Sequence, residues 1–261
     1  MLMAMILFDF IKRMFEKKTK KMEKVFLPSQ GLFYNDDFEV TIKKVDMKEI
    51  LEYESGYDRE DLGIVLGKLK KVVKNNTSFT KEYTFEDIKS IDVVYIFLEI
   101  VSFTKKKPIE LEYFNDEIGI VDKISFDEKT FNYFRFDSDF MKSWNSEEKC
   151  FVIDGYKFTL PSIGLENTLT NYLIKKSGDD DAAKYNEYSY NFTYFLGDRK
   201  QMTFDEIENI IQIFNFDMDE EEVDKTDDIV RIFIPLQRYS LIRNDKVIEI
   251  SSKINLQEIW K

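Results

Sequence analysis

The sequence predicts an α+β fold: a helical N-terminal part, a β-hairpin insertion in the middle, and a helical C-terminal part that ends in a short β-hairpin. Three patterns favour this fold. Apolar residues recur at the helical period of about 3.6 residues in two stretches before residue 105. Between residues 109 and 160 they alternate with polar residues, as strands require. Helix-capping signals return after residue 200.

The N-terminal part begins with a strand and continues as helices. Phe38–Ile42 alternates between apolar and polar residues, which is typical of a half-buried strand. Leu62–Val73 keeps the helical period, with lysines largely on the opposite face. Thr84–Asp87 (Thr-Phe-Glu-Asp) is a variant of the capping box, and we expect it to start a strongly apolar helix over Ile88–Val101.

The middle of the chain predicts two hairpins. Ile109–Tyr113 and Ile118–Val121 alternate on either side of an Asn-Asp turn. Cys150–Leu160 forms the clearer hairpin, because its central Asp154-Gly155 is the dipeptide that a type I′ turn prefers.

The C-terminal part predicts helices followed by strands. Apolar residues over Leu165–Leu173 suggest a helix, and Thr203–Glu206 is a capping box before a second one. Arg231–Ile234 and Val247–Ile250 alternate well enough to predict strands, with a turn at Asn244-Asp245.

These elements divide the chain into four parts, which are a leader (1–24), an extended turn, strand and helical part (25–108), a β-rich insertion (109–161) and a helical part with terminal strands (162–261). The leader is apolar over Met1–Ile11 apart from Asp9, and then basic. An amphipathic helix that binds a membrane or a partner is one interpretation, although the apolar run is too short to span a bilayer. The other is that translation starts at Met22 and the leader is an annotation artefact.

The amino-acid composition restricts the kinds of catalytic site, metal site and partner that this chain can have. The chain has no histidine and a single cysteine, Cys150, which excludes Ser-His-Asp and Cys-His nucleophiles, histidine acid–base catalysis and zinc sites of Cys and His. The lone cysteine lies beside an apolar strand and suits a buried, inert role. The formal charge of −12 disfavours nucleic-acid binding. We therefore expect no cofactor and no nucleic-acid partner.

An acidic run over Asp217–Asp228 is the remaining candidate for chemistry. Read as a calcium loop, Asp217, Asp219, Glu221 and Asp228 take positions 1, 3, 5 and 12, but glutamate replaces the glycine of position 6. A solvated helix start, favoured by the helix dipole, explains the run better. A metal-dependent enzyme that uses Asp217, Asp219 and Glu221 is the competing class of function.

The most distinctive segment is Leu27–Tyr34 (Leu-Pro-Ser-Gln-Gly-Leu-Phe-Tyr), and part of it recurs as Leu160–Leu165 (Leu-Pro-Ser-Ile-Gly-Leu). Proline fixes its own φ and favours extended backbone before it, while Gly31 permits a tight bend. Nothing in either copy is reactive. The pattern therefore indicates architecture or docking.

This segment, followed by a strand at Val40–Ile42 and the start of a helix at Met47–Leu51, resembles the opening of the T-even-type baseplate hub and tail-assembly proteins of contractile-tailed phages, over roughly residues 25–57. Some members carry paired cysteines that suggest a zinc ribbon in the β insertion; this chain has one cysteine, so apolar packing must hold its insertion.

The resemblance implies a non-enzymatic baseplate hub subunit or an assembly factor. Its partners would be other baseplate or tail proteins, or further copies of itself, in the virion or in the host cytoplasm during assembly. The candidate interaction residues are then Leu27, Pro28, Ser29, Gly31, Phe33 and Tyr34. They would dock on a neighbouring subunit or brace the domain that does so; burial of Phe33 and Tyr34 in the chain's own core is the alternative.

Overall fold

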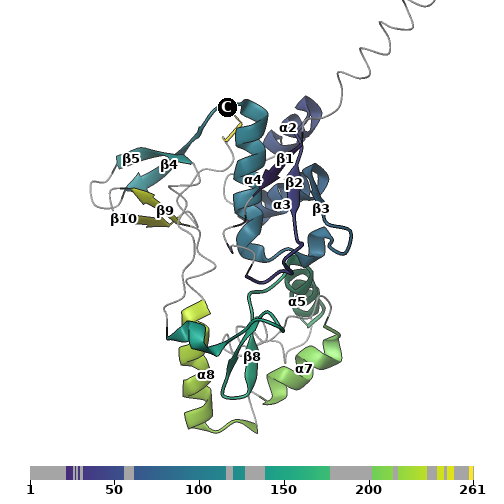
Figure 1. Ribbon diagram of the computed structural model, residues 1–261, viewed down its shortest axis with the longest axis vertical. Coiled ribbons are helices and arrows are strands. Elements are labelled where there is room, and N and C mark those ends of the chain that lie inside the picture. The colour runs from purple at the N-terminus through teal and green to yellow at the C-terminus, as the bar shows by residue number, and fades with distance from the viewer. Residues whose placement is uncertain are drawn as a thin grey trace, which may run out of the picture.

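The computed structural model describes residues 22–25, 27, 29, 32–55, 62–115, 120–126, 139–176, 202–213, 217–233, 240–243, 246–249 and 259–260. Its elements in chain order are β1 (Glu23–Val25), β2 (Val40–Ile42), α2 (Met47–Glu54), α3 (Leu62–Asn76), β3 (Thr77–Phe79), η1 (Phe85–Asp87), α4 (Ser90–Lys105), β4 (Ile109–Asn115), β5 (Ile120–Phe126), η2 (Phe140–Ser143), β6 (Trp144–Asn145), β7 (Cys150–Ile153), β8 (Tyr156–Phe158), α5 (Ile163–Lys176), α7 (Phe204–Gln212), α8 (Glu220–Phe233), β9 (Ser240–Arg243) and β10 (Lys246–Glu249) (Figure 1). The chain mixes helices with small antiparallel sheets, which agrees with the predicted α+β class.

The N-terminal part packs helices α2, α3 and α4 with the antiparallel sheet β1-β2-β3. The predicted strand at Phe38–Ile42 is confirmed as β2, with Thr41 opposite Lys24 of β1 and Ser78 of β3. Most of the leader lies outside the described residues. Its expected end at residue 24 falls inside β1.

Helix α4 is the centre of this part, because nearly every residue from Ile91 to Val101 is buried. Its neighbours form one apolar cluster, called here the N-terminal core, which includes Tyr34, Ile42, Tyr53, Leu69, Val73, Tyr95, Phe97 and Leu98. The end of the chain returns to it: the Trp260 ring lies 6.2 Å from Phe97 and 6.3 Å from Tyr53, centroid to centroid.

The start of α4 differs from the prediction. The Thr84 capping box exists, with the Thr84 amide donating to the Asp87 carboxylate at 2.7 Å, but it caps the short 3₁₀ turn η1. Ile88 and Lys89 are then extended, and α4 begins at Ser90. The reason is a tertiary contact: the Ile88 carbonyl accepts from the Ile163 amide, which holds this stretch out of the helix.

The predicted Cys150–Leu160 hairpin is confirmed as β7–β8. Asp154 and Gly155 both have positive φ, 50° and 85°, as a type I′ turn requires. Cys150 is buried, as expected. The hairpin, β6 and α8 enclose a second cluster, called here the hairpin core, of Phe33, Ile91, Phe151, Phe158, Leu160, Ile229 and Val230.

Helices α5 and α7 pack together over Leu165, Leu169, Tyr172, Ile207 and Ile211. The capping box predicted at Thr203 is confirmed, because its hydroxyl accepts from the Glu206 amide at 3.2 Å. The predicted strand at Arg231–Ile234 is wrong for its first three residues, which end α8. Buried Ile229 and Val230, and an Arg231–Asp227 ion pair at 2.7 Å, continue the helix through the short alternating run.

The predicted strands near residues 109–121 are confirmed as β4 and β5, which pair from Ile109↔Phe126 to Asn115↔Ile120. The predicted terminal strand is β10, and it pairs with β9. Both hairpins lie together at one side of the molecule (Figure 1). Asn115, predicted to be a turn residue, is the last residue of β4 and pairs with Ile120, so the strand runs longer than predicted. The other turn residues Asp116, Asn244 and Asp245 are outside the described residues.

Candidate functional site

The described residues of the first Leu-Pro-Ser segment are largely buried. Of the six residues predicted to interact, Leu27, Ser29, Phe33 and Tyr34 are buried. Pro28 and Gly31 are outside the described residues. The alternative, burial of Phe33 and Tyr34 in the chain's own core, is confirmed, and these side chains are not exposed for direct contact with a partner.

Ser29 and Tyr34 converge on Asp92, in the first turn of α4. The Asp92 carboxylate accepts from the Ser29 amide at 3.1 Å, from the Ser29 hydroxyl at 2.9 Å and from the Tyr34 hydroxyl at 2.7 Å. The Tyr34 oxygen in turn accepts from the Lys89 backbone amide at 2.8 Å. One phenol hydroxyl therefore serves as donor and acceptor, and it ties the bend to the start of the helix.

Burial governs the electrostatics of this network. Asp92 is 0 % exposed, and desolvation raises the pKa of its carboxyl to about 6, against the opposing effect of the Tyr34 and Ser29 hydrogen bonds and the Lys89 charge. Desolvation and the nearby carboxylate raise the pKa of Tyr34 well above 10. A buried acid with a raised pKa is a feature of many active sites, but here all of its partners belong to the chain and are closed to solvent.

The second Leu-Pro-Ser segment reaches the same helix start. The Pro161 carbonyl accepts from the Ser90 amide at 2.9 Å, and Ser162 forms a β-bridge with Lys89. The Ser162 hydroxyl accepts from the Leu165 amide at 3.2 Å, which caps α5. The two copies of the motif, 133 positions apart in the sequence, thus bind adjacent residues of one helix.

Neighbouring residues of the first segment enter different cores. Tyr34 stacks on Phe38, with centroids 4.0 Å apart, in the N-terminal core. Phe33 packs edge-on against Trp144 at 5.4 Å and near Phe151 at 6.4 Å in the hairpin core. The buried Lys89 ammonium lies 5.7 Å from the Phe33 ring. We define this junction as Ser29, Phe33, Tyr34, Lys89, Asp92 and the residues of 159–163 that bind them; it joins the two cores.

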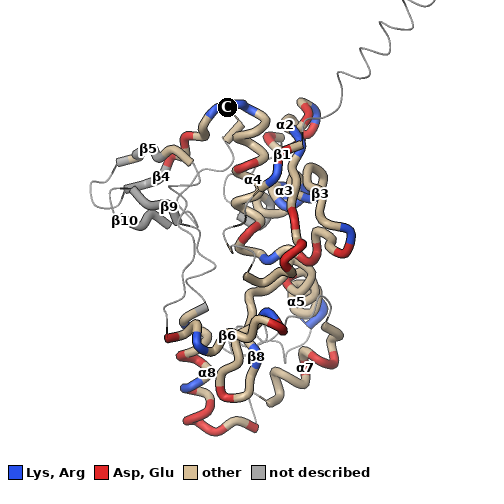
Figure 2. The backbone as a smooth tube through the Cα atoms, viewed as in Figure 1, with Lys and Arg blue, Asp and Glu red and all other residues tan. Residues whose placement is uncertain are grey.

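The acidic run forms the start of helix α8 (Figure 2). Asp219 and Glu222 cap it reciprocally, with the Glu222 amide 2.9 Å from the Asp219 carboxylate. Glu221 pairs with Lys225 at 2.8 Å. This arrangement matches the solvated helix start and differs from a calcium loop, whose ligands lie on a bent loop. Within the described ranges, no three carboxylates or thiols gather closely enough to hold a metal ion.

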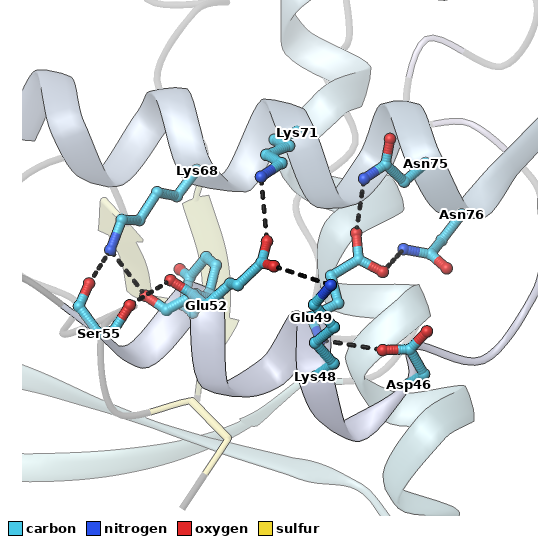
Figure 3. A network of polar contacts seen from close by, with 10 residues as sticks. Asp46, Lys48, Glu49, Glu52, Ser55, Lys68, Lys71, Asn75 and Asn76 are labelled. Carbon is cyan, nitrogen blue, oxygen red and sulfur yellow. Dashed lines mark hydrogen bonds and ion pairs between the residues drawn. The ribbon is translucent and has the colours of Figure 1, made fainter.

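Helix α2 packs Ile50 and Tyr53 on the N-terminal core and leaves two other apolar side chains exposed to solvent. Met47 and Leu51, one turn apart, are 69 % and 59 % exposed. On the inner side, Glu49 accepts from Asn75 at 3.0 Å and Asn76 at 2.8 Å (Figure 3).

Further polar contacts complete this α2–α3 clamp. Glu52 pairs with Lys71 of α3 at 3.1 Å, and Lys68 donates to the Tyr53 carbonyl at 3.2 Å and to the Ser55 carbonyl (Figure 3). The clamp fixes the helix while leaving Met47 and Leu51 free of the core.

Comparisons with protein-family models, with curated proteins and with solved structures each gave no match. In the described part of the chain, no helix is long and apolar enough to cross a membrane.

Sequence reasoning named Ser29 and Tyr34 but missed their partners Asp92 and Lys89. The available signal was an aspartate placed between isoleucine and valine at the start of the most apolar helix, where an unpaired charge would be costly. The exposed face of α2 was also missed, because its apolar spacing over one turn looks like an ordinary core contact.

Proposed function

We propose that this chain is a non-enzymatic baseplate hub subunit or assembly factor of a contractile-tailed phage, and that it works by binding other tail proteins. The observation that carries the proposal is the exposed apolar pair Met47 and Leu51 of α2. This helix belongs to the same segment, residues 25–57, that resembles the phage family.

The two halves of that segment have different roles: the first supports the fold and the second contacts the partner. Leu27, Ser29, Phe33 and Tyr34 brace the N-terminal core against the hairpin core through the junction. Met47 and Leu51 supply the contact, because apolar side chains one helical turn apart are the usual anchors of a helix that docks in a groove. The α2–α3 clamp holds the helix before binding, so little further ordering is needed when a partner docks.

The interaction is tested by replacing Met47 and Leu51 together with aspartate, with Val121→Asp as a matched control, because Val121 is 60 % exposed on β5. Cross-linking and mass spectrometry of infected cells should lose tail-protein cross-links to α2 in the double variant and keep them in the control. Equal cross-linking in all three proteins would contradict the proposal for this face.

The role is tested by quantitative mass spectrometry of purified virions beside the infected-cell lysate. A fixed copy number in particles is the result expected of a hub subunit. Presence in the lysate and absence from particles is the result expected of an assembly factor. A chain encoded and expressed outside any phage context would refute both roles.

A further inference from the structure

A lysine-lined cleft lies at the far end of α4 from the junction. The helix ends at Lys105, and the turn Lys106–Pro108 leads into β4. Two cavities, of about 990 and 590 Å³, both border this turn at Lys107 and Pro108, and both are also lined by Ser125 of β5. Phe103 lines the larger one and supplies apolar surface beside the charges.

The positive charge of the cleft is concentrated in its turn, where Lys105, Lys106 and Lys107 are consecutive. The whole lining has five lysines and four glutamates, a formal charge of +1 on an acidic protein. Its lysines are Lys44, Lys105, Lys106, Lys107 and Lys123, and its glutamates are Glu23, Glu99, Glu110 and Glu112. Some of these lysines are engaged: Lys123 pairs with Glu112 at 3.3 Å, and Lys105 donates to the Ile259 carbonyl at 2.8 Å. Lys106 and Lys107 have no ion-pair partner among the described residues.

The backbone and the charges at the end of α4 suit a site that binds an anion. Lys106 holds the left-handed conformation, with φ 58°, at a helix end where glycine is favoured. A left-handed residue ends many helices, and here it turns the chain from α4 into β4. Burial, and then the like charge of Lys107, lower the pKa of Lys105. A bound carboxylate would relieve that repulsion.

The opposite end of the molecule carries the complementary charge. Eight acidic residues and one lysine lie between Asp217 and Asp228, and the α8 start that they form is exposed. Figure 2 places this acidic start and the Lys105–Lys107 turn at opposite ends of the long axis, so one molecule cannot join them. A second copy can.

We propose that the lysine cleft of one copy binds the acidic start of α8 of a second copy, so that the chain associates head to tail. Such a contact is heterologous: each molecule keeps one free cleft and one free helix start, and growth continues until a ring closes or an open chain forms. Because the attraction is between exposed charges, salt weakens it. This inference does not depend on the proposed phage function.

The test is sedimentation velocity of the purified full chain over a range of concentrations, at about 50 and about 500 mM salt. Wild type should associate at low salt and weaken at least about tenfold at high salt. The cleft variant Lys106→Glu/Lys107→Glu and the helix variant Glu220→Lys/Glu221→Lys should each stay monomeric. Asp219 and Glu222 are left intact, so the cap of α8 is preserved.

Mixing the two variants tests whether the cleft of one copy binds the α8 start of another. The intact α8 of the cleft variant should bind the intact cleft of the helix variant and restore association. The neutral variant Glu220→Gln/Glu221→Gln, which removes charge without placing lysine at a helix start, should weaken association less than reversal does. The control Lys48→Glu/Lys81→Glu changes net charge equally on other exposed lysines and should associate as wild type.

Three results would overturn the proposal: a monomer at every concentration, association unaffected by salt, or a mixture of variants that does not associate.

Discussion

Replacing Asp92 with asparagine is expected to change how stability depends on pH. The folded-state pKa of this carboxyl is about 6, raised by burial from 3.8. In the unfolded chain it titrates near its ordinary value, so between about pH 4 and pH 6 the folded protein binds more protons than the unfolded chain. The stability that this group contributes is therefore fully present below about pH 4 and is lost as pH rises toward 6.

The magnitude follows from the two pKa values. Their difference corresponds to about 3 kcal/mol of unfolding free energy over the whole titration. The sequence pI is about 4.8, so measurements are best kept above pH 5 to avoid precipitation. As the pH rises from about 5 to 7.5, the unfolding free energy of wild type should fall by about 1.4 kcal/mol relative to that of the Asp92→Asn variant.

The assay is urea unfolding followed by tryptophan fluorescence at several pH values. The quantity of interest is the difference in unfolding free energy between wild type and variant at each pH, because contributions from other titrating groups cancel in it. Asp37→Asn is the control, since Asp37 is exposed. A wild-type-minus-variant difference that stays constant from pH 5 to 7.5 would refute the reasoning.

Three further outcomes are expected. Tyr34→Phe removes a buried hydroxyl that both donates and accepts, and should lower the urea-derived unfolding free energy by about 1–3 kcal/mol; a change under about 0.5 would speak against the network. Glu49→Ala opens the α2–α3 clamp and should speed amide exchange in α2, whereas Lys48→Ala, which is exposed, should not; equal rates in both would contradict the clamp. Gly155→Ala forces a side chain onto φ +85° and should destabilise the hairpin by about 1–2 kcal/mol, read from the emission of Trp144 in unfolding; an unchanged curve would contradict the turn assignment.

Local patterns predicted much of the secondary structure. Alternation located β2, β4 and β7, and the Asp154-Gly155 turn and the Thr203 cap formed as their residue types require. These signals act over a few residues and need no knowledge of distant partners. Predictions failed where distant partners decide the structure: a contact with Ile163 delays the start of α4.

The candidate site was predictable only in part, for the same reason. The two Leu-Pro-Ser copies were visible in the sequence, and so was the prospect that they are architectural. Both copies contact Lys89–Asp92 only because tertiary packing brings together residues more than 50 positions apart in the sequence. The spacing of residues along the sequence does not predict which distant residues come into contact. The polar contacts of Glu49 and Glu52 with α3 likewise depend on residues that are distant in the sequence, and so does the exposure of Met47 and Leu51.

Because the junction joins the two cores, we predict that they unfold as one unit. The two tryptophans report on the unfolding of the two cores separately. Trp144 lies in the hairpin core and Trp260 in the N-terminal core. Fluorine NMR of the protein labelled with 5-fluorotryptophan resolves both residues in a single urea titration. Both folded resonances should disappear at the same midpoint, and Tyr34→Phe should move both together. Loss of one resonance at a lower urea concentration, with only that one shifted by Tyr34→Phe, would contradict a junction that joins the cores.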